Sequence, residues 1–283
     1  IEFQNRTSFY VSVLFFQKKI KKEGKRMHVK EFFDLTGKTA IVTGGGRGLG
    51  EQIATGLAEA GANVVLCSRK VEACQEVANE LEQLGVKTLA LQCDVTNPED
   101  VQNVVEQTLN HFGKIDILVN NSGATWGAPA IDMPLEAWQK VMNVNVTGTF
   151  LMSQAVGREM IKQRAGKIIN ISSIAGFIGT DPKLMDTVAY NASKGAVNTL
   201  TKDLAVKWGQ YNINVNAIAP GFFPTKMSKV IIERGKDAFL EATPLNRFGS
   251  ENDLKGVALF LASKASDYIT GEIIIVDGGM HAK

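Results

Sequence analysis

The residues best suited to chemistry are a tyrosine and a lysine four positions apart, Tyr190 and Lys194. They fall in a stretch predicted to be helical, where positions i and i+4 share one face. Free tyrosine has a pKa of about 10, so only about 0.1% is phenolate at neutral pH. A nearby ammonium favours the phenolate, and a pKa lowered by a few units would suit Tyr190 to general acid–base catalysis. A Tyr-x-x-x-Lys spacing is common, so this interpretation depends on the rest of the chain.

A glycine-rich turn near the start of the chain, TGGGRGLG at 43–50, predicts a phosphate-binding site. It lies between a predicted strand and a predicted helix, the context in which such turns hold a dinucleotide. Glycines let the backbone approach a pyrophosphate closely, and the helix amino end offers free N–H groups and a positive dipole. A merely structural turn is the alternative. The candidate cofactor residues of the turn are Thr43, Gly44, Gly46, Arg47, Gly48, Leu49 and Gly50.

The end of the second predicted strand bears on which dinucleotide is bound. An acidic residue there would bind the ribose 2′-hydroxyl and repel a 2′-phosphate, but the strand ends Cys67-Ser68-Arg69. Arg69 suits a phosphate because a guanidinium donates two parallel hydrogen bonds. Ser68 is a further donor and Arg47 a second cation. The sequence therefore favours NADP(H), while NAD(H) stays possible if Arg69 is only a solvated loop residue.

Strand and helix patterns alternate along the chain from Leu35 onward. Continuously apolar runs are typical of parallel strands buried on both faces, and the alternation indicates a doubly wound α/β fold. We expect one Rossmann domain with a seven-stranded, mostly parallel sheet and helices on both faces. The predicted strands are 39–43, 62–67, 87–92, 116–120, 167–171, 213–217 and 272–276. The predicted helices are 48–60, 72–84, 98–112, one that opens at Pro134, 145–163, 188–208 and 251–262, with 221–246 irregular to helical.

Composition and charge exclude several classes of protein. With 283 residues, 45% apolar and 21% charged, the chain has the composition of a soluble globular protein of one large domain or two small ones. Its net charge of +2 gives no reason to expect a nucleic acid as partner. The three cysteines, Cys67, Cys74 and Cys93, lack disulfide or metal-binding spacing. We expect free thiols, no metal site and a cytoplasmic protein.

The first 26 residues differ from the rest of the chain. They carry seven basic and two acidic side chains, a net +5, which leaves −3 from Met27 onward. Their apolar run is too short to span a bilayer, and the basic residues follow it, unlike a signal peptide. Since Lys22-Glu23-Gly24 can be encoded by a ribosome-binding site just before Met27, we interpret 1–26 as a non-native or disordered leader. A basic tail at a membrane surface is the alternative; residues 27–283 are expected to form one domain without a membrane partner.

Eight motifs in a fixed order supply the context that single residues lack. They are TGGGRGLG (43–50), CDV (93–95), NNSG (120–123), NVNVTGTF (143–150), NISS (170–173), YNASK (190–194), NVNAIAPG (214–221) and VDGG (276–279). With this set, the chain resembles the short-chain dehydrogenase/reductase family over essentially Leu35 to Gly279. The resemblance implies a nicotinamide-dependent oxidoreductase that interconverts a ketone and a secondary alcohol by hydride transfer.

The resemblance also implies roles for the matching residues. Tyr190 would be the general acid and base, and Lys194 would lower its pKa; both would contact the cofactor. Ser173, rather than Ser172, would orient the substrate oxygen, and Asn145 would anchor a water in a proton relay to Lys194. The further cofactor residues are Asp94 and Val95 around the adenine, Asn120, Ser122 and Gly123 along the cleft, and Pro220, Gly221 and Thr225 near the nicotinamide. Several of these lie at carboxyl ends of predicted strands, the edge where open α/β sheets bind ligands.

The substrate side is where the chain departs from the family's pattern. The segment between Ser173 and Tyr190 is several residues longer than is usual in the family, so it is expected to shape the substrate pocket. We interpret its charges as solvated. Segment 222–245 resembles the family's substrate lid. The candidate substrate residues are Trp126, Phe222 and Phe223, beside Ser173 and Tyr190; packing under the lid is the alternative for the three aromatic residues.

Within the family the likeness is strongest to gluconate 5-dehydrogenases and 3-oxoacyl-[acyl-carrier-protein] reductases. The substrate implied is a keto-sugar acid or a 3-oxoacyl thioester, since fold and motif do not decide between them. Arg158, Lys162 and Arg164 are available to an acidic carrier protein, although a solvated helix face is the simpler interpretation. The family also implies a homotetramer. A non-catalytic sensor or scaffold that binds dinucleotide is the alternative function, against which the complete catalytic set argues.

Overall fold

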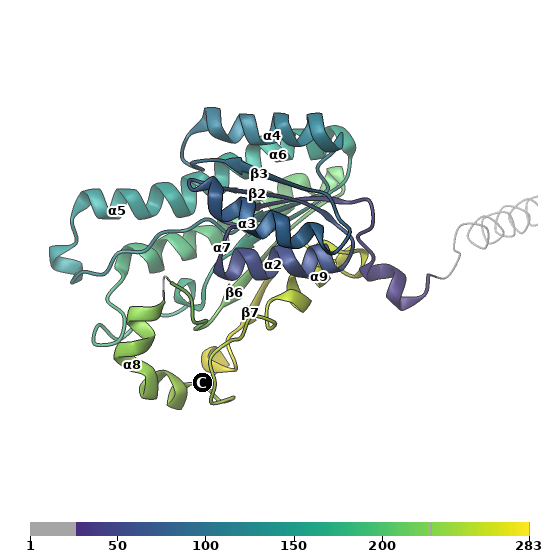
Figure 1. The fold of residues 1–283 in the computed structure, drawn as a ribbon. Coiled ribbons are helices and arrows are strands. Elements are labelled where there is room, and N and C mark those ends of the chain that lie inside the picture. The colour runs from purple at the N-terminus through teal and green to yellow at the C-terminus, as the bar shows by residue number, and fades with distance from the viewer. Residues whose placement is uncertain (1–26, 227, 283) are drawn as a thin grey trace, which may run out of the picture. The chain divides into compact units, whose positions relative to one another are not determined.

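Seven strands form one sheet in the order β3-β2-β1-β4-β5-β6-β7, and every pairing between neighbours is parallel (Figure 1). The strands are β1 (Thr39–Thr43), β2 (Asn63–Ser68), β3 (Thr88–Gln92), β4 (Ile117–Asn120), β5 (Gly166–Ile171), β6 (Ile213–Pro220) and β7 (Ile273–Val276). This confirms the predicted doubly wound α/β class. The computed structural model describes residues 27–226 and 228–282, so the interpretation of 1–26 lies outside the described residues.

Helices cover both faces of the sheet. They are α2 (Gly48–Glu59), α3 (Val71–Glu82), α4 (Pro98–Phe112), α5 (Leu135–Met142), α6 (Gly148–Gln163), α7 (Val188–Trp208), α8 (Lys229–Ala242) and α9 (Lys255–Ala262). Apolar side chains of α2, α3 and α9 form one large buried cluster with the sheet, those of α4, α6 and α7 form a second, and a small third cluster lies on β6 and β7. Figure 1 shows α4 and α6 on the opposite side of the sheet from α2 and α9.

Alternate residues of a strand belong to the two large clusters in turn, because successive side chains in a strand point to opposite faces. In β1, Ala40 and Val42 belong to the cluster under α2, whereas Ile41 belongs to the cluster under α4 and α6. All five residues of β1 are buried. The continuously apolar strands predicted from the sequence therefore reflect burial on both faces.

The long helix differs from its prediction at one turn. A helix break was expected before Asn145, but the backbone stays helical from α5 through a π turn, η3 (Asn143–Thr147), into α6. A π turn adds one residue to the helical repeat and is often found at functional sites. Here it contains Asn145, one of the predicted catalytic residues.

Helix α9 is shorter than the prediction of 251–262. It begins at Lys255, because Asp253 holds the preceding residues in a turn. The Asp253 carboxylate accepts hydrogen bonds from Ser250 N at 2.6 Å and from Ser250 Oγ at 2.8 Å, and it pairs with Arg247. Polar side chains that bind the local backbone compete with helix formation.

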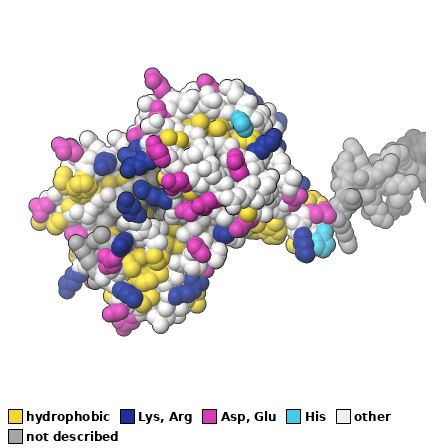
Figure 2. Space-filling view, in the orientation of Figure 1, with side chains coloured by type: hydrophobic (Ala, Val, Ile, Leu, Met, Phe, Trp, Pro, Cys, Tyr) yellow, Lys and Arg dark blue, Asp and Glu magenta, His cyan; other side chains and the backbone are white. Residues whose placement is uncertain are grey.

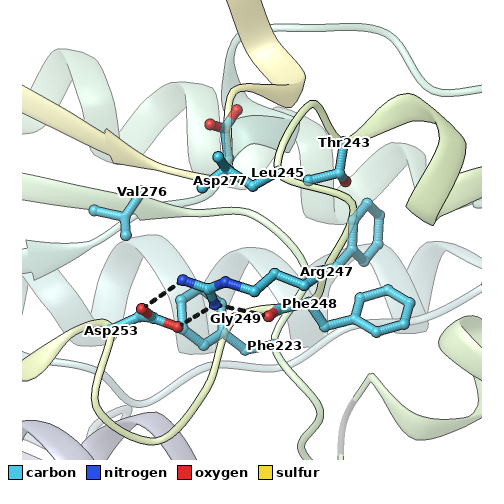
Figure 3. A pocket seen from close by; sticks show the side chains of 11 residues that line it. Phe223, Thr243, Leu245, Arg247, Phe248, Gly249, Asp253, Val276 and Asp277 are labelled. Carbon is cyan, nitrogen blue, oxygen red and sulfur yellow. Dashed lines mark hydrogen bonds and ion pairs between the residues drawn. The ribbon is translucent and has the colours of Figure 1, made fainter.

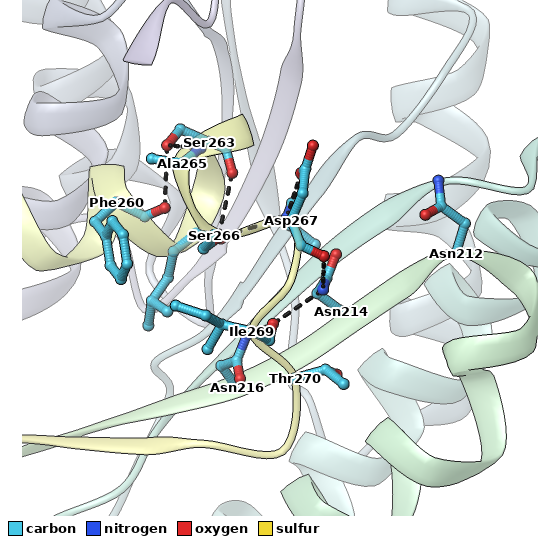
Figure 4. A network of polar contacts seen from close by, with 12 residues as sticks. Asn212, Asn214, Asn216, Phe260, Ser263, Ala265, Ser266, Asp267, Ile269 and Thr270 are labelled. Atoms are coloured by element: carbon cyan, nitrogen blue, oxygen red, sulfur yellow. Dashed lines mark hydrogen bonds and ion pairs between the residues drawn. The ribbon is translucent and has the colours of Figure 1, made fainter. Parts of the chain in front are cut away.

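Asparagine side chains of β6 form hydrogen bonds with the segment between α9 and β7 (Figure 4). Asn214 Nδ2 and Asn216 Nδ2 each donate to the Ile269 carbonyl at 2.9 Å. Asn216 Oδ1 accepts from Glu272 N at 3.0 Å, and Val215 N donates to Thr270 Oγ1 at 3.0 Å. These bonds satisfy buried backbone groups and bring β7 into register at the edge of the sheet.

No helix in the described part of the chain could traverse a lipid bilayer, since none is both long and apolar enough. Cys67, Cys74 and Cys93 are free and buried, as expected. Within residues 27–226 and 228–282, no three His, Cys, Asp or Glu side chains gather into a group able to hold a metal ion.

Candidate active site

The glycine-rich turn links β1 to the amino end of α2, as predicted. Gly44 adopts φ +63°, a conformation that favours glycine. A Cβ on Gly50 would lie 2.4 Å from the Gly44 carbonyl oxygen, and one on Gly46 would lie 2.8 Å from the Ala73 carbonyl carbon. These glycines therefore allow the turn to fold against α2 and α3. The first backbone N–H groups of α2 are thereby directed to the carboxyl edge of the sheet, where they suit an anion.

A second loop locks the turn in place. Thr43 Oγ1 accepts hydrogen bonds from Asn121 N and Ser122 N, both at 3.0 Å. Asn121 Nδ2 donates to the carbonyl oxygens of Thr43 at 2.9 Å and Gly44 at 3.1 Å. Asn121 was not among the predicted residues, although it stands in the NNSG motif beside three that were. Its contacts are with residues 77 and 78 positions earlier, which spacing alone does not reveal.

Asn120, a predicted cofactor residue, directs its side chain into the protein. Its Nδ2 donates to Ser153 Oγ and Asn170 Oδ1, both at 2.9 Å, and Asn170 in turn donates to Thr201 Oγ1. The side chain thus joins the sheet to α6 and α7. Its neighbours Ser122 and Gly123 lie farther along the loop at the edge of the sheet, and Gly123 approaches Asn145.

Cations follow the carboxyl ends of β1 and β2. Arg47 and Arg69 are exposed, as is Lys70 next to Arg69. The pKa of Asp94 is lowered by hydrogen bonds from Thr96, and the charge of Arg69 acts in the same direction. Figure 2 shows Lys and Arg side chains grouped beside the hollow at this end of the strands. The Arg47 and Arg69 side chains are thus both accessible to an anion from solvent.

Ser68 and Val95, two further candidates on the adenine side of the cofactor site, make contacts within the protein. Ser68 Oγ donates to the Lys70 carbonyl at 2.8 Å, which shapes the turn after β2. The Val95 side chain is buried, and a Cβ on Gly148 would lie 2.6 Å from its Cγ2 atom. Val95 therefore packs on the start of α6.

Tyr190, Lys194 and Ser173 come together at the carboxyl edge of the sheet. Tyr190 and Lys194 lie one turn apart on α7, with Lys194 Nζ 5.5 Å from the centre of the tyrosine ring. Nζ also donates to the Ile171 carbonyl at 2.7 Å. Ser173 follows β5, where its Oγ accepts from Ala175 N at 3.2 Å, and it forms a side-chain hydrogen bond with Tyr190. Two segments, the end of β5 and one turn of α7, thus place two acidic or basic groups and a hydroxyl within one small region.

Burial dominates the electrostatics of this group. It lowers the pKa of Lys194 from 10.5 to about 8, since only 5% of the residue is exposed. It also raises the pKa of the Tyr190 phenol, and the hydrogen bond with Ser173 acts in the opposite direction. In this structure the net shift of the Tyr190 pKa is upward, and the expected lowering by Lys194 stays a prediction.

Asn145 and Ser193 brace the active-site helix. The Asn145 side chain, 1% exposed, accepts from Ala124 N at 2.7 Å and donates to Ala124 O at 2.9 Å and Ser193 Oγ at 2.8 Å. Ser193 Oγ then donates to the Tyr190 carbonyl at 2.7 Å. The π turn thus connects the loop after β4 with the turn of α7 that carries Tyr190. Ser193 was missed by the sequence analysis, although it stands within the YNASK motif.

The preference for Ser173 over Ser172 agrees with their contacts. Ser172 Oγ donates to Asn198 Oδ1 at 2.6 Å and is buried, so its hydroxyl is committed to α7. Asn198 Nδ2 donates to the Gly176 carbonyl at 3.4 Å. These bonds hold the loop that presents Ser173.

The nicotinamide-side candidates begin where β6 ends. Gly221 N donates to the Val276 carbonyl at 2.9 Å, and a Cβ on Gly221 would lie 2.7 Å from Asp277 Cβ. Pro220 is buried at the end of β6. Thr225 reaches the glycine-rich turn, since a Cβ on Gly48 would lie 3.5 Å from Thr225 Cγ2. The segment after β6 therefore passes over the amino end of α2.

The three aromatic substrate candidates are not brought to one place. Trp126 is 45% exposed on the loop after β4. Phe222 stacks on Phe239 of α8 at a ring separation of 4.0 Å, and Phe223 is buried. Both line a pocket of about 170 Å³ in which Arg247 pairs with Asp253 (Figure 3). Neither Ser173 nor Tyr190 lines that pocket.

The cations on the long helix have partners within the chain. Arg158 donates to Gln154 Oε1 at 3.3 Å, Lys162 pairs with Glu159 at 2.7 Å, and Arg164 donates to the Gln210 carbonyl at 3.2 Å. All three are exposed. These contacts are those of a solvated helix face.

Comparisons with known proteins find relatives that are similar to this chain over most of its length. A family model described as Enoyl-(Acyl carrier protein) reductase matches residues 44–281. The chain is 39% identical over 256 residues to 5-keto-D-gluconate 5-reductase of Escherichia coli, covering 89% of this chain and 98% of the relative. It is 42% identical over 247 residues to the 3-oxoacyl-[acyl-carrier-protein] reductase FabG of Aquifex aeolicus, covering 87% and 98%. The crystal structure of a gluconate 5-dehydrogenase from Burkholderia cenocepacia in complex with NADP and tartrate is similar, with a TM-score of 0.86, 37% identity and coverage of 90% and 100%.

Proposed function

Because the chain belongs to the short-chain dehydrogenase/reductase family, we propose that it is an NADP(H)-dependent oxidoreductase that interconverts a ketone and a secondary alcohol, with Tyr190 as general acid and base. The main support for this proposal is that Tyr190, Lys194 and Ser173 lie together at the carboxyl edge of the sheet. The glycine-rich turn lies at the same edge. The residues fit the cofactor: a glycine turn and helix amino end suit a pyrophosphate, and Arg47 and Arg69 suit a 2′-phosphate.

In the direction of reduction, a nicotinamide dinucleotide held by the glycine-rich turn would supply the hydride that the carbonyl carbon accepts. Ser173 donates a hydrogen bond to the carbonyl oxygen and orients it. The O–H bond of Tyr190 breaks as its proton passes to that oxygen, and Lys194, through its ammonium, supports the phenolate that remains. Oxidation of the alcohol reverses each transfer. Positioning and proton transfer of this kind are what general acid–base catalysis requires.

A keto-sugar acid is the substrate class that we favour. Two relatives have names that refer to gluconate chemistry, and this chain is similar to each of them over nearly the whole of that relative's length. Together these similarities support the choice. A 3-oxoacyl thioester is the second candidate, supported by the similarity to FabG. The contacts of Arg158, Lys162 and Arg164 within the chain weigh against a docking site for an acidic carrier protein at that face.

The proposal is tested by mixing the purified full chain with NADPH or NADH and a panel of candidate substrates. The panel contains 5-ketogluconate, acetoacetyl thioesters and small diketones. We expect loss of NADPH absorbance with 5-ketogluconate and slower loss with the thioesters. Binding of NADPH without turnover of any ketone or alcohol would instead support the non-catalytic sensor or scaffold. Faster turnover with NADH than with NADPH would reject the cofactor assignment alone.

We also propose that the enzyme is a cytoplasmic homotetramer of one Rossmann domain per chain, with 222–245 as its substrate lid. The free, buried cysteines support a reducing compartment. Light scattering coupled to gel filtration measures the oligomeric state, and a monomeric mass at micromolar concentration would reject the tetramer.

A further inference from the structure

The segment 179–187, called here the insertion loop, lies in the stretch between Ser173 and Tyr190, which is expected from the sequence to be longer than usual in the family. It is folded on itself: Thr180 Oγ1 donates to the Met185 carbonyl at 2.8 Å, and the Asp181 carbonyl accepts from Leu184 N at 2.9 Å. Asp181 and Lys183 are exposed. These two charged side chains thus face solvent, whereas Leu184 is half-buried.

Contacts with two other segments hold the insertion loop beside Tyr190. Ala128 N, on the loop after β4, donates to the Asp186 carbonyl at 3.0 Å, and Ala128 pairs with Thr187 as a parallel bridge. Asn191, the residue after Tyr190, donates from Nδ2 to Thr180 Oγ1 at 3.4 Å and accepts from Thr187 Oγ1 at 3.0 Å. The loop is therefore held to the same turn of α7 that carries the acid–base residue.

A third contact joins the insertion loop to the lid helix. A Cβ on Gly235 of α8 would lie 3.0 Å from Leu184 Cδ2 and 2.8 Å from Phe239 Cε2. Leu184 thus packs against the α8 backbone at the one place where that helix is kinked, since Gly235 has φ −123° and ψ 21°. Any larger residue at 235 would have to displace Leu184, Phe239 or the helix.

The contact continues to the end of β6. Phe239 is 2% exposed, and its ring stacks on Phe222 at 4.0 Å. Phe222 directly follows Gly221, whose backbone is bonded to β7. A chain of packed groups therefore runs from Leu184 through Gly235 and Phe239 to Phe222, and well-packed groups transmit displacement because interiors hold few voids.

We infer that Leu184 is a positioning residue: by packing on Gly235, it sets how closely α8 approaches the turn of α7 that carries Tyr190, and so limits which ketones fit between them. This inference rests on the proposed ketone reductase function. The loop acts by steric contact rather than by charge, because the side chain that meets α8 is a leucine. Its effect is expected on substrate binding, and the atoms that transfer the proton and hold the dinucleotide are untouched.

The test compares L184A, L184M, G235A and the double variant L184A/G235A with the wild type; K183A, an exposed neighbour, is the matched control. With the ketone found by the substrate panel, L184A and G235A should raise KM about tenfold or more with kcat changed less than about twofold, as for a methyl-scale change in a pocket. The Kd for NADPH should not change. L184M and K183A should behave like the wild type. The double variant should raise KM by less than the product of the single effects, because removing Leu184 makes room for the Gly235→Ala methyl.

A second readout does not need turnover. Trypsin cleavage after Lys236, an exposed residue next to the kink, should be several-fold faster in L184A and G235A than in K183A, with no difference in the thermal unfolding of the rest of the chain. Unchanged KM and unchanged cleavage in L184A, or strictly multiplicative effects in the double variant, would overturn the inference. A wild type that turns over no ketone would reject the proposed function, while the cleavage rates would still decide whether Leu184 holds α8.

Discussion

Asn145 Nδ2 lies 2.8 Å from Ser193 Oγ, so a side chain from the π turn of one long helix is hydrogen-bonded to the helix that carries Tyr190. Ser193 passes the connection on to the Tyr190 carbonyl. Both polar atoms of the Asn145 side-chain amide thus hold other residues and brace the turn of α7 that carries Tyr190. Its predicted part in a proton relay stays a prediction.

Removing this brace should cost stability as well as rate. In N145A, buried groups of Ala124 and Ser193 lose their partners, and an unsatisfied buried polar group costs about 1–3 kcal/mol. The free energy of unfolding from urea titration should fall by that amount, and kcat should fall more than ligand binding does. T199A, which removes an exposed hydroxyl farther along α7, is the control. A loss in T199A equal to that in N145A would contradict the interpretation.

Tyr190→Phe should abolish the proton transfer and leave the fold intact. Since positioned acids and bases contribute about 10²–10⁴-fold to rate, kcat should drop by that factor. The Kd for NADPH, measured by fluorescence titration, should stay within about twofold of the wild-type value, because the ring and its packing remain. Y268F, at a fully exposed tyrosine, should keep the wild-type rate. Wild-type turnover in Y190F would remove Tyr190 from the mechanism.

The buried Lys194 should make stability depend on alkaline pH. Its pKa is lowered from 10.5 to about 8 in the folded chain, so unfolding takes up a proton between these values. Stability therefore rises as pH increases through this window, by on the order of 3 kcal/mol from this group. The stability difference between K194M and the wild type should accordingly shift in favour of the wild type from pH 7 to pH 10.5. A difference independent of pH, measured by urea unfolding at each pH, would argue against a buried ammonium.

Arg69→Asp should reverse the cofactor preference. The substitution removes a candidate phosphate partner and supplies the acid that binds a ribose 2′-hydroxyl. Charge-assisted hydrogen bonds contribute about 1.5–3 kcal/mol, so kcat/KM for NADPH should fall tenfold to a hundredfold while that for NADH holds or rises. K87D, an exposed cation at the opposite end of β3, gives the effect of charge alone. Equal losses for NADPH and NADH in R69D would place Arg69 outside the 2′-phosphate site.

Much of the fold was predictable because each strand and helix carries its own local signal. The glycine-rich turn and Pro134 marked element boundaries, and apolar runs marked strands buried on both faces. The π turn was not predictable, because the wider turn is recognised only from its hydrogen bonds. The start of α9 was misplaced for a similar reason, since the side chain of Asp253 binds Ser250 and Arg247 in the folded chain.

By itself, the sequence determined the α/β class, the glycine-rich turn and the pairing of Tyr190 with Lys194, because these follow from short-range spacing along helices and strands. Only the tertiary structure decided that Asn120 points inward while Asn121 holds the turn, that burial raises rather than lowers the pKa of Tyr190, and that Leu184 meets Gly235. Each of these depends on residues far apart in the chain. Desolvation and packing are properties of the folded neighbourhood, and no spacing along the chain specifies them.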